Sequence, residues 1–319
     1  MTIDITLPDG TIRNYESPVT GYEIAESIGP RLLKDSICIE INNNFKDLSY
    51  EITDNNTVRI VTKKDLDALN ILRHSSAHIL AQAVLNLYPD AQYGVGPSIE
   101  NGFYYDFLFS KPLKESDLLD IELEMKKIVK SSQNFVRSEI TKKDATKLFK
   151  KQTLKIELIE SAESNEGVGN DTVSLYHNDE FVDLCMGPHI PNTSLLKYFK
   201  LTKLSGAYWR GDETNIQLQR IYGTSWFSKE DLNTYLIQQE EAEKRDHRKL
   251  GNELDLFTTS EELGSGNFLW KPKGAILRDV IESYSKKAHM NNGYSLVNTP
   301  HIGKSILWET SGHLDHYSE

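Results

Sequence analysis

Cysteine is scarce in this sequence, which has only Cys38 and Cys185 among its 319 residues. So few cysteines cannot form a disulfide framework, which makes the reducing cytoplasm the expected compartment. Long apolar runs are lacking as well, since none approaches the roughly 20 residues that a membrane-spanning helix needs. The opening MTIDITLPDG lacks the basic and apolar segments of a signal peptide. We therefore expect a cytoplasmic protein without a membrane partner.

Basic residues are in the minority. Lys and Arg total 36 against 47 Asp and Glu, which gives a net charge of −11. This balance argues against a protein that coats nucleic acid nonspecifically, although a local basic surface on an acidic body can still hold phosphates. At 319 residues with 38% hydrophobic side chains, the chain is long enough for more than one packed domain.

The first segment, residues 1–62, predicts a small mixed domain. Apolar residues alternate over 3–7, as on a strand with one buried face, and a capping-box spacing then opens a short helix. Further strands are expected at 36–41 and 57–61, with Cys38 as a small core residue. This ββαββ order predicts a ubiquitin-like β-grasp domain.

A second domain is predicted over residues 63–227. Its apolar residues from Leu66 to Leu87 form one helical stripe, and His74 and His78 lie on a face roughly opposite that stripe. Because a helix that is apolar on both sides is normally covered on both sides, we expect the two imidazoles to line an internal cleft. Further helices are expected near 115–131 and 143–151, and further strands near 135–140, 172–177 and 180–185.

The remaining sequence predicts a charged linker helix over 228–248 and the start of another domain over 249–319. In that last segment we expect a helix at about 275–291 and a strand over 294–300, YSLVNTP. No domain closes after residue 250, and the expectation is a truncated domain.

His74 and His78 are the first candidates for chemistry. Their spacing on a helix lets two imidazoles converge on one metal ion or one substrate. The zinc-protease version of this motif needs Glu directly after the first His, where this chain has Ser75, so that class of enzyme is disfavoured.

The second candidate is DLCMGPH at 183–189. Asp183 and Cys185 alternate onto the same side of a strand, and the Gly-Pro pair that follows lets His189 fold back beside Cys185. Each residue alone is most simply a structural one. The four side chains together favour a functional site, because polar groups that converge in a cleft are costly unless used.

Two kinds of chemistry suit this set. His74, His78, Cys185 and His189 make a tetrahedral zinc set. Without metal, the same four groups could position a water by hydrogen bonding and shift each other's protonation.

Four motifs in this order and spacing resemble the editing domain of bacterial threonyl-tRNA synthetases: HSSAHILAQA, YGVGPSIENGFYYDF, DLCMGPHIPNT and KLSGAYWRGDETNIQLQRIYGTSW. The N-terminal domain resembles the TGS domain of that family. KRDHRKLGNELDLF, the helix and strand up to Pro300, and LWETSGHLDHYSE resemble the opening of its class II catalytic domain, with motif 1. The resemblance implies an α+β protein with a β-grasp TGS domain, an editing domain whose helix packs on an antiparallel sheet, a linker helix, and a truncated antiparallel-sheet catalytic domain.

The resemblance also implies a function, the hydrolysis of seryl-tRNA(Thr), with the acceptor end of tRNA(Thr) as partner. Editing is needed because the methyl group that serine lacks is worth only about 1–3 kcal/mol in a pocket. On this basis Cys185 shapes the pocket or holds water rather than forming an acyl-enzyme, and Lys155 has a competing interpretation as a solvated strand lysine. The implied site residues are His74, His78, Tyr105, Lys155, Asp183, Cys185 and His189.

For the full-length family the resemblance implies homodimers that charge tRNA(Thr) with ATP, using Mg and Zn at sites that follow this sequence. This chain would then show only deacylase activity and need no cofactor for it. His301, His313 and His316 precede that zinc site and are not assigned to it. Two alternatives stay open: a zinc-dependent editing hydrolase of the alanyl-tRNA kind, and a non-catalytic tRNA-binding module.

Basic and aromatic residues also mix over 197–220, which suits contact with phosphates and unpaired bases. A strand pair with solvated lysines and a core Trp209 is the equal alternative.

Overall fold

The computed structural model describes residues 1–161, 167–169, 171–264 and 266–316. Its internal contacts divide the chain into two units, Met1–Leu236 and Ile237–Glu319. Helices and mostly antiparallel sheets occur together in the first unit, and the predicted α+β class with a β-grasp domain is confirmed. The domain boundaries given above stay predictions.

The β-grasp domain is built on one five-stranded sheet in the order β2-β1-β7-β4-β5. Its hairpin from β4 to β5 turns at Asn42 and Asn43, which both adopt positive φ, as a tight two-residue hairpin turn requires. The Thr20 hydroxyl accepts the Glu23 amide N–H at the start of α1, and the Glu23 carboxylate accepts the Thr20 amide N–H. The predicted capping box is therefore present. The elements are β1 (Thr2–Thr6), β2 (Ile12–Glu16), β3 (Val19–Thr20), α1 (Gly21–Ile28), α2 (Pro30–Asp35), β4 (Ser36–Ile41), β5 (Asn44–Asp47), β6 (Glu51–Ile52) and β7 (Asn56–Thr62).

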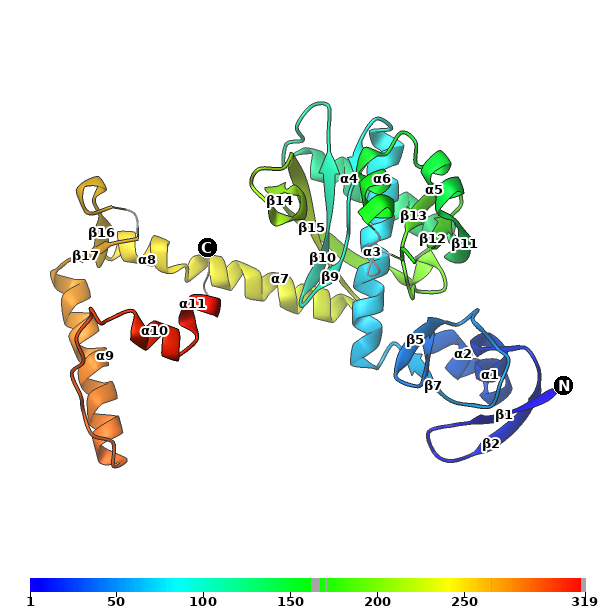
Figure 1. Cartoon of the computed structure of the whole chain (residues 1–319), viewed down its shortest axis with the longest axis horizontal. Helices are drawn as coiled ribbons and strands as arrows, with labels where there is room; N and C mark the ends of the chain where they lie inside the picture. The colour runs from blue at the N-terminus through cyan, green and yellow to red at the C-terminus, as the bar shows by residue number, and fades with distance from the viewer. Residues whose placement is uncertain (162–166, 170, 265, 317–319) are drawn as a thin grey trace. The chain divides into compact units, whose positions relative to one another are not determined.

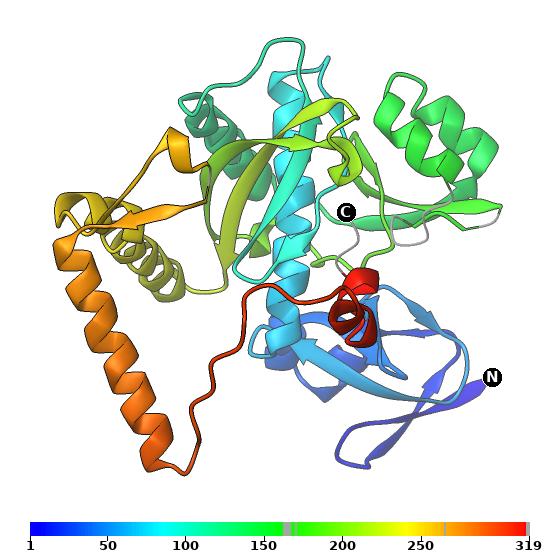
Figure 2. The same cartoon turned by 60° about the vertical axis from the view of Figure 1, so that its left-hand side comes forward.

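The helix α3 (Leu66–Leu87) is the central element of the next domain and has the bounds that the apolar stripe predicted. It packs against a sheet of order β14-β15-β10-β8, as Figures 1 and 2 show, and most of its residues from Ala68 to Val84 are buried. The helix α4 (Asp117–Ser131) also packs on α3. The strands are β8 (Gln92–Tyr93), β9 (Ser98–Ile99), β10 (Gly102–Leu108), β14 (Tyr198–Tyr208) and β15 (Gln217–Trp226).

A smaller sheet of order β11-β12-β13 completes this domain. Lys155 lies on the helix α6 of this domain and its side chain is buried, so the interpretation of Lys155 as a solvated strand lysine is wrong. A short apolar run such as LKIELIE fits a helix as well as a strand, and tertiary packing decides between them. The elements are β11 (Val136–Thr141), α5 (Lys142–Leu148), α6 (Thr153–Ser161), β12 (Thr172–Asn178), β13 (Phe181–Leu184) and the 3₁₀ turns η2 (Thr193–Leu195) and η3 (Trp209–Gly211).

The β-grasp domain and the α3 domain share one apolar core. Ile37, Cys38 and Val61 of the β-grasp sheet belong to the same buried cluster as Leu72 and Phe103. Cys38 is fully buried in this cluster, as expected of a core residue.

The predicted linker helix is divided in two. The first helix, α7, covers Lys229–Lys244, and the second, α8, covers His247–Glu253. Asp246 caps α8, because its carboxylate accepts the amide N–H groups of Arg248 and Lys249. The remaining elements are β16 (Phe257–Thr259), η4 (Glu261–Leu263), β17 (Phe268–Trp270), α9 (Pro272–Asn291), α10 (Ile306–Thr310) and α11 (His313–His316).

The strand predicted over 294–300 is wrong. Those residues are exposed and irregular, and the described residues of the second unit offer no sheet beyond the β16–β17 pair for them to join. Of the helices in the described residues, none combines the length and the apolarity required to traverse a bilayer.

Candidate active site

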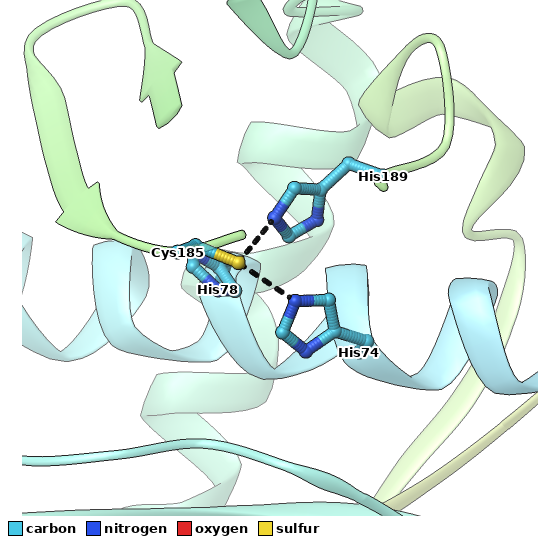
Figure 3. Close-up of side chains that lie close together, drawn as sticks. All are labelled: His74, His78, Cys185 and His189. Atoms are coloured by element: carbon cyan, nitrogen blue, oxygen red, sulfur yellow. Dashed lines mark hydrogen bonds between the residues drawn. The ribbon is translucent and has the colours of Figure 1, made fainter. Parts of the chain in front are cut away.

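Three histidines and one cysteine converge beside α3, as Figure 3 shows. His74 and His78 project from consecutive turns of the helix, and Cys185 directly follows β13. Nε2 of His74 lies 3.0 Å from Sγ of Cys185, and Nε2 of His189 lies 3.4 Å from the same sulfur. The rings of His78 and His189 meet edge to face, with centroids 4.4 Å apart.

The turn from Cys185 to His189 is fixed by its backbone. The Gly187 amide donates to Cys185 Sγ at 3.2 Å, and Ser174 bonds both the amide and the carbonyl of Cys185. Gly187 has a φ of +75°, and a Cβ there would collide with the Tyr176 hydroxyl. Only glycine fits a left-handed position with no space beside it, which is why Gly187 allows His189 to return to the cysteine.

A second buried network lies behind His78. The Asp183 carboxylate accepts the Tyr105 hydroxyl at 2.5 Å and pairs with Lys155 Nζ at 2.5 Å. Lys155 Nζ also lies 3.1 Å from the Tyr105 oxygen. Nδ1 of His78 lies 3.4 Å from Asp183 Oδ2, without the alignment of a hydrogen bond. The negative carboxylate favours the proton on Nδ1 of His78 and leaves Nε2 as an acceptor.

Ser75 determines the tautomer of His189. The Ser75 hydroxyl donates its single proton to the Ile71 carbonyl at 2.8 Å and accepts the Ile190 amide at 3.0 Å. Nδ1 of His189 lies 3.0 Å from the same oxygen. Because that oxygen has no second proton to give, Nδ1 of His189 must be the donor. Nε2 of His189 is then the acceptor nitrogen that faces Cys185.

Burial keeps the imidazoles neutral. It lowers the pKa of His74 to about 4, against a smaller opposing effect of the Gly96 backbone. Burial, with His74 and Lys155 nearby, also holds the pKa of His78 well below its usual value. The pKa of His189 is held down by burial and by the other two histidines. Burial raises the pKa of Asp183, and Lys155 and Tyr105 oppose that rise. Each of these imidazoles is therefore neutral at neutral pH and keeps one ring nitrogen as a hydrogen-bond acceptor.

A pocket of about 370 Å³ opens beside the cluster. A volume of this size suits a small ligand. His189 and Lys155 are not among the described residues that line it, so they lie behind the lining side chains. The lining residues are His74, His78, Gly96, Pro97, Ser98, Tyr105, Asp183, Leu184, Cys185, Met186 and Gly187.

The same four side chains fit a metal ion. Their donor atoms all lie within 4.8 Å of one another, whereas the ligands of a tetrahedral zinc ion are about 3.3–3.8 Å apart, from bond lengths of about 2.0–2.3 Å. Small shifts of the side chains would therefore complete a zinc site. Ser75 and Asp183 lie against the outward nitrogens of His189 and His78, as second-layer partners do around zinc.

The structure brings together all seven residues that the sequence selected: the three histidines, Cys185, Tyr105, Lys155 and Asp183. Sequence reasoning did not select Ser75 or Tyr176. Ser75 had a signal, since it stands inside HSSAH on the helix that carries the histidines. Trp209 is buried, with its indole N–H on Glu157, which agrees with the core alternative for that residue.

Two family models match parts of the chain. Residues 3–62 match the TGS domain, and residues 173–222 match the second additional domain of threonyl and alanyl tRNA synthetases. The second match covers β12 to most of β15 and therefore includes Asp183, Cys185 and His189.

Longer relatives match nearly the whole chain. Over 99% of its length the chain is 48% identical to the threonine--tRNA ligase of Nitrosococcus oceani, covering 48% of that protein. It is 47% identical over 99% of its length to the threonine--tRNA ligases of Citrifermentans bemidjiense and Streptococcus pneumoniae serotype 19F, covering 49% and 48% of them. The chain is a homologue of threonine–tRNA ligases. The resemblance to threonyl-tRNA synthetases is thereby confirmed, and the chain spans about half the length of these ligases.

Proposed function

We propose that the pocket beside α3 hydrolyses seryl-tRNA(Thr), and that the chain serves a threonine–tRNA ligase that charges tRNA(Thr) with ATP. The observation that carries this proposal is the convergence of three neutral imidazoles and Cys185 beside one pocket. Cys185 and His189 also lie within residues 173–222, which match the second additional domain of threonyl and alanyl tRNA synthetases. Buried polar groups of this kind are costly to assemble and typical of functional sites.

Water is the nucleophile in the proposed reaction. The neutral imidazole of His74 or His78 accepts a proton from water while its oxygen attacks the carbonyl carbon of the seryl ester. The tetrahedral intermediate then collapses and breaks the bond to the ribose oxygen. That oxygen takes the proton from the imidazole, and serine and free tRNA leave.

The other residues around the cluster have positioning roles. Lys155 and Tyr105 hold Asp183, and Asp183 favours the His78 tautomer whose Nε2 is an acceptor. Cys185 orders the pocket through the Gly187 amide and His74. A Cys185→Ala variant that keeps partial activity would agree with this role and exclude a covalent one, whereas a fully active variant would exclude both.

A hydrolytic pocket supplies selectivity that an activation site lacks. Serine differs from threonine by one methyl group, and a single methyl group discriminates by only about 1–3 kcal/mol. A second pocket that accepts serine and rejects the larger threonine multiplies that discrimination.

A zinc-dependent hydrolase is the second candidate, favoured by the donor set itself. His74, His78, Cys185 and His189 would hold the ion. Bound zinc would polarise a carbonyl or lower the pKa of a water. The metal-free reaction is preferred because His74 Nε2 and Cys185 Sγ lie only 3.0 Å apart, closer than zinc ligands and suited to a direct hydrogen bond.

The deciding experiment is deacylation of seryl-tRNA(Thr) and threonyl-tRNA(Thr) by the full chain, with and without chelator. We expect fast, serine-selective and chelator-insensitive hydrolysis that falls at least about 100-fold in His74→Ala/His78→Ala. The matched control is His177→Ala, which removes a histidine of the same domain that bonds Ser138 outside the cluster.

Three other outcomes have defined meanings. Hydrolysis lost with chelator and restored by zinc would establish the zinc-dependent alternative. Tight tRNA binding without hydrolysis would favour a non-catalytic module, and equal rates on both substrates would contradict an editing role. Adding ATP, threonine and tRNA tests the expectation that this chain alone does not threonylate.

The cytoplasmic location, the ATP, Mg and Zn of the longer ligase, and its homodimeric state belong to the same proposal.

A further inference from the structure

Asp47 links the β-grasp domain to the cluster. It is the last residue of β5, and its Oδ1 accepts the His189 amide at 2.9 Å across 142 positions of sequence. Its Oδ2 accepts the Tyr176 hydroxyl at 2.6 Å. One carboxylate of the first domain therefore holds two groups that adjoin the proposed hydrolytic pocket.

Both partners of Asp47 control the turn that carries His189. The Tyr176 ring lies edge to face against the His189 imidazole, with centroids 4.3 Å apart. The Tyr176 hydroxyl occupies the space where a side chain at position 187 would lie. Gly187 in turn donates its amide to Cys185 Sγ. A continuous path of contacts thus runs from Asp47 through Tyr176 and the turn to the cluster.

Asp47 stands on the opposite side of this turn from the substrate pocket. Gly187 and Met186 line the pocket with His74, while Met186 and Pro188 line a neighbouring pocket with Asp47 and Tyr176. The turn is therefore the wall between the two pockets, and Asp47 supports that wall from behind.

Holding the two domains together does not require this carboxylate. Ile37, Cys38 and Val61 already join them through the shared apolar core. Burial raises the pKa of Asp47, while Tyr176 and the His189 amide oppose that rise, so the carboxylate is placed there at a cost. A costly buried group with two directed bonds into one turn is better explained by positioning than by adhesion.

We propose that Asp47 is a positioning residue of the hydrolytic site, through which the N-terminal β-grasp domain fixes the turn that carries His189. The proposal rests on the proposed function for its catalytic consequence. It also makes a structural claim, the ordering of residues 185–189, that can be measured without any hydrolysis.

The test compares Asp47→Ala, Asp47→Asn and Tyr176→Phe in the full chain, with Asp54→Asn as a control on an exposed aspartate of the same domain. We expect Asp47→Ala to lower kcat for seryl-tRNA(Thr) by about tenfold to 100-fold with KM within about twofold, since misplacement changes the rate more than binding. Asp47→Asn keeps an oxygen acceptor for the His189 amide and should stay within about threefold of wild type. Asp54→Asn should match wild type.

The second measurement is the rate at which iodoacetamide alkylates Cys185, followed by peptide mass spectrometry with the fully buried Cys38 as internal reference. A loosened turn should raise the Cys185 rate in Asp47→Ala by about tenfold, with a smaller rise in Tyr176→Phe and little change at Cys38. A variant that merely destabilised the fold would raise both rates together.

The outcomes separate the two proposals. Wild-type kcat and wild-type Cys185 alkylation in Asp47→Ala would overturn the role of Asp47. Absence of hydrolysis in the wild type would overturn the proposed function alone, and the alkylation rates would still decide the role of Asp47. If Asp47→Ala does not fold, Tyr176→Phe decides: unchanged kcat and unchanged Cys185 alkylation in that variant would overturn the proposal.

Discussion

The first unit, Met1–Leu236, contains two buried apolar cores, whereas none of the large apolar side chains described in the second, Ile237–Glu319, is buried. Among the described residues of the second unit only Gly251 and Gly274 are buried. The helix α9 shows a continuous exposed stripe of Ile276, Leu277, Val280, Ile281 and Tyr284.

Both units nevertheless form a long helix where the sequence predicted one, α3 in the first unit and α9 in the second. Local signals such as caps and apolar periodicity are enough to specify a helix, but burial needs a partner surface. The candidate chemistry lies in the unit where burial is complete, because shifted pKa values and buried ion pairs require exclusion of water.

The largest effect on this contrast is expected from Lys155→Ala in the first unit. The substitution leaves the buried Asp183 carboxylate without its Nζ partner at 2.5 Å. Removing one member of a buried pair costs about 3–5 kcal/mol, and urea unfolding would measure it. The control Lys147→Ala breaks an exposed pair with Asp144 and should change the free energy of unfolding by less than about 0.5 kcal/mol. Similar effects of both substitutions would contradict the prediction.

Amide hydrogen exchange should separate the units next. The amides of α3 lie in a packed core and should open only with much of the first unit, whereas those of α9 should open locally. We expect exchange in α9 to be at least about 100-fold faster than in α3. Equal protection of the two helices would show that exposure of the apolar stripe does not weaken α9.

Acid should destabilise the first unit selectively. Burial lowers the pKa of His74 to about 4 in the folded protein, whereas the same imidazole has a pKa of about 6.5 in the unfolded chain. Between these values the unfolded state binds a proton that the folded state does not, so stability is full above pH 6.5 and is lost as pH falls toward 4. His74 alone should account for about 2 kcal/mol between pH 7 and pH 5, and His78 and His189 add in the same direction.

Urea unfolding at pH 7, 6 and 5 would measure this slope. His74→Asn should reduce it, and His177→Asn, outside the cluster, should not. A slope that His74→Asn leaves unchanged would mean that the cluster is not the source of acid sensitivity.

The smallest effect is expected from Ile281→Ser in the second unit. Ile281 is 59% exposed, and substitutions at such positions change the free energy of unfolding by about 0.5 kcal/mol or less. The matched change in the first unit, Leu72→Ala at a fully buried position of α3, should cost about 2–5 kcal/mol. A comparable loss in the free energy of unfolding from both substitutions would contradict the distinction between the units.

Sequence reasoning succeeded for elements whose signal is long and local. The stripe of α3 extends over 22 residues and gave the correct bounds. It failed for Lys155 and for residues 294–300, where a short apolar run fits either structure or where a strand needs a neighbour that the run itself does not reveal.

The site was partly predictable for the same reason. Motif spacing placed His74 beside His78 and Cys185 beside His189, and the shared donor chemistry of the four predicted one site. The inclusion of Tyr105 and Lys155 followed only from the family resemblance. Ser75 and Tyr176 were not selected because their decisive contacts cross 114 and 129 positions. Asp47, on a hairpin of another domain, gave no sequence signal at all.

The sequence separations that close the site also set the order in which it can form. Ser75 meets Ile190 across 115 positions, and Asp47 meets His189 across 142. Contacts of such separation form slowly, because a long loop must be confined first. During synthesis on the ribosome, the helix with both histidines is complete long before Cys185 is added. The cluster is therefore completed in one late step, and a nascent chain that stalls before residue 185 has the histidine pair without Cys185 and His189.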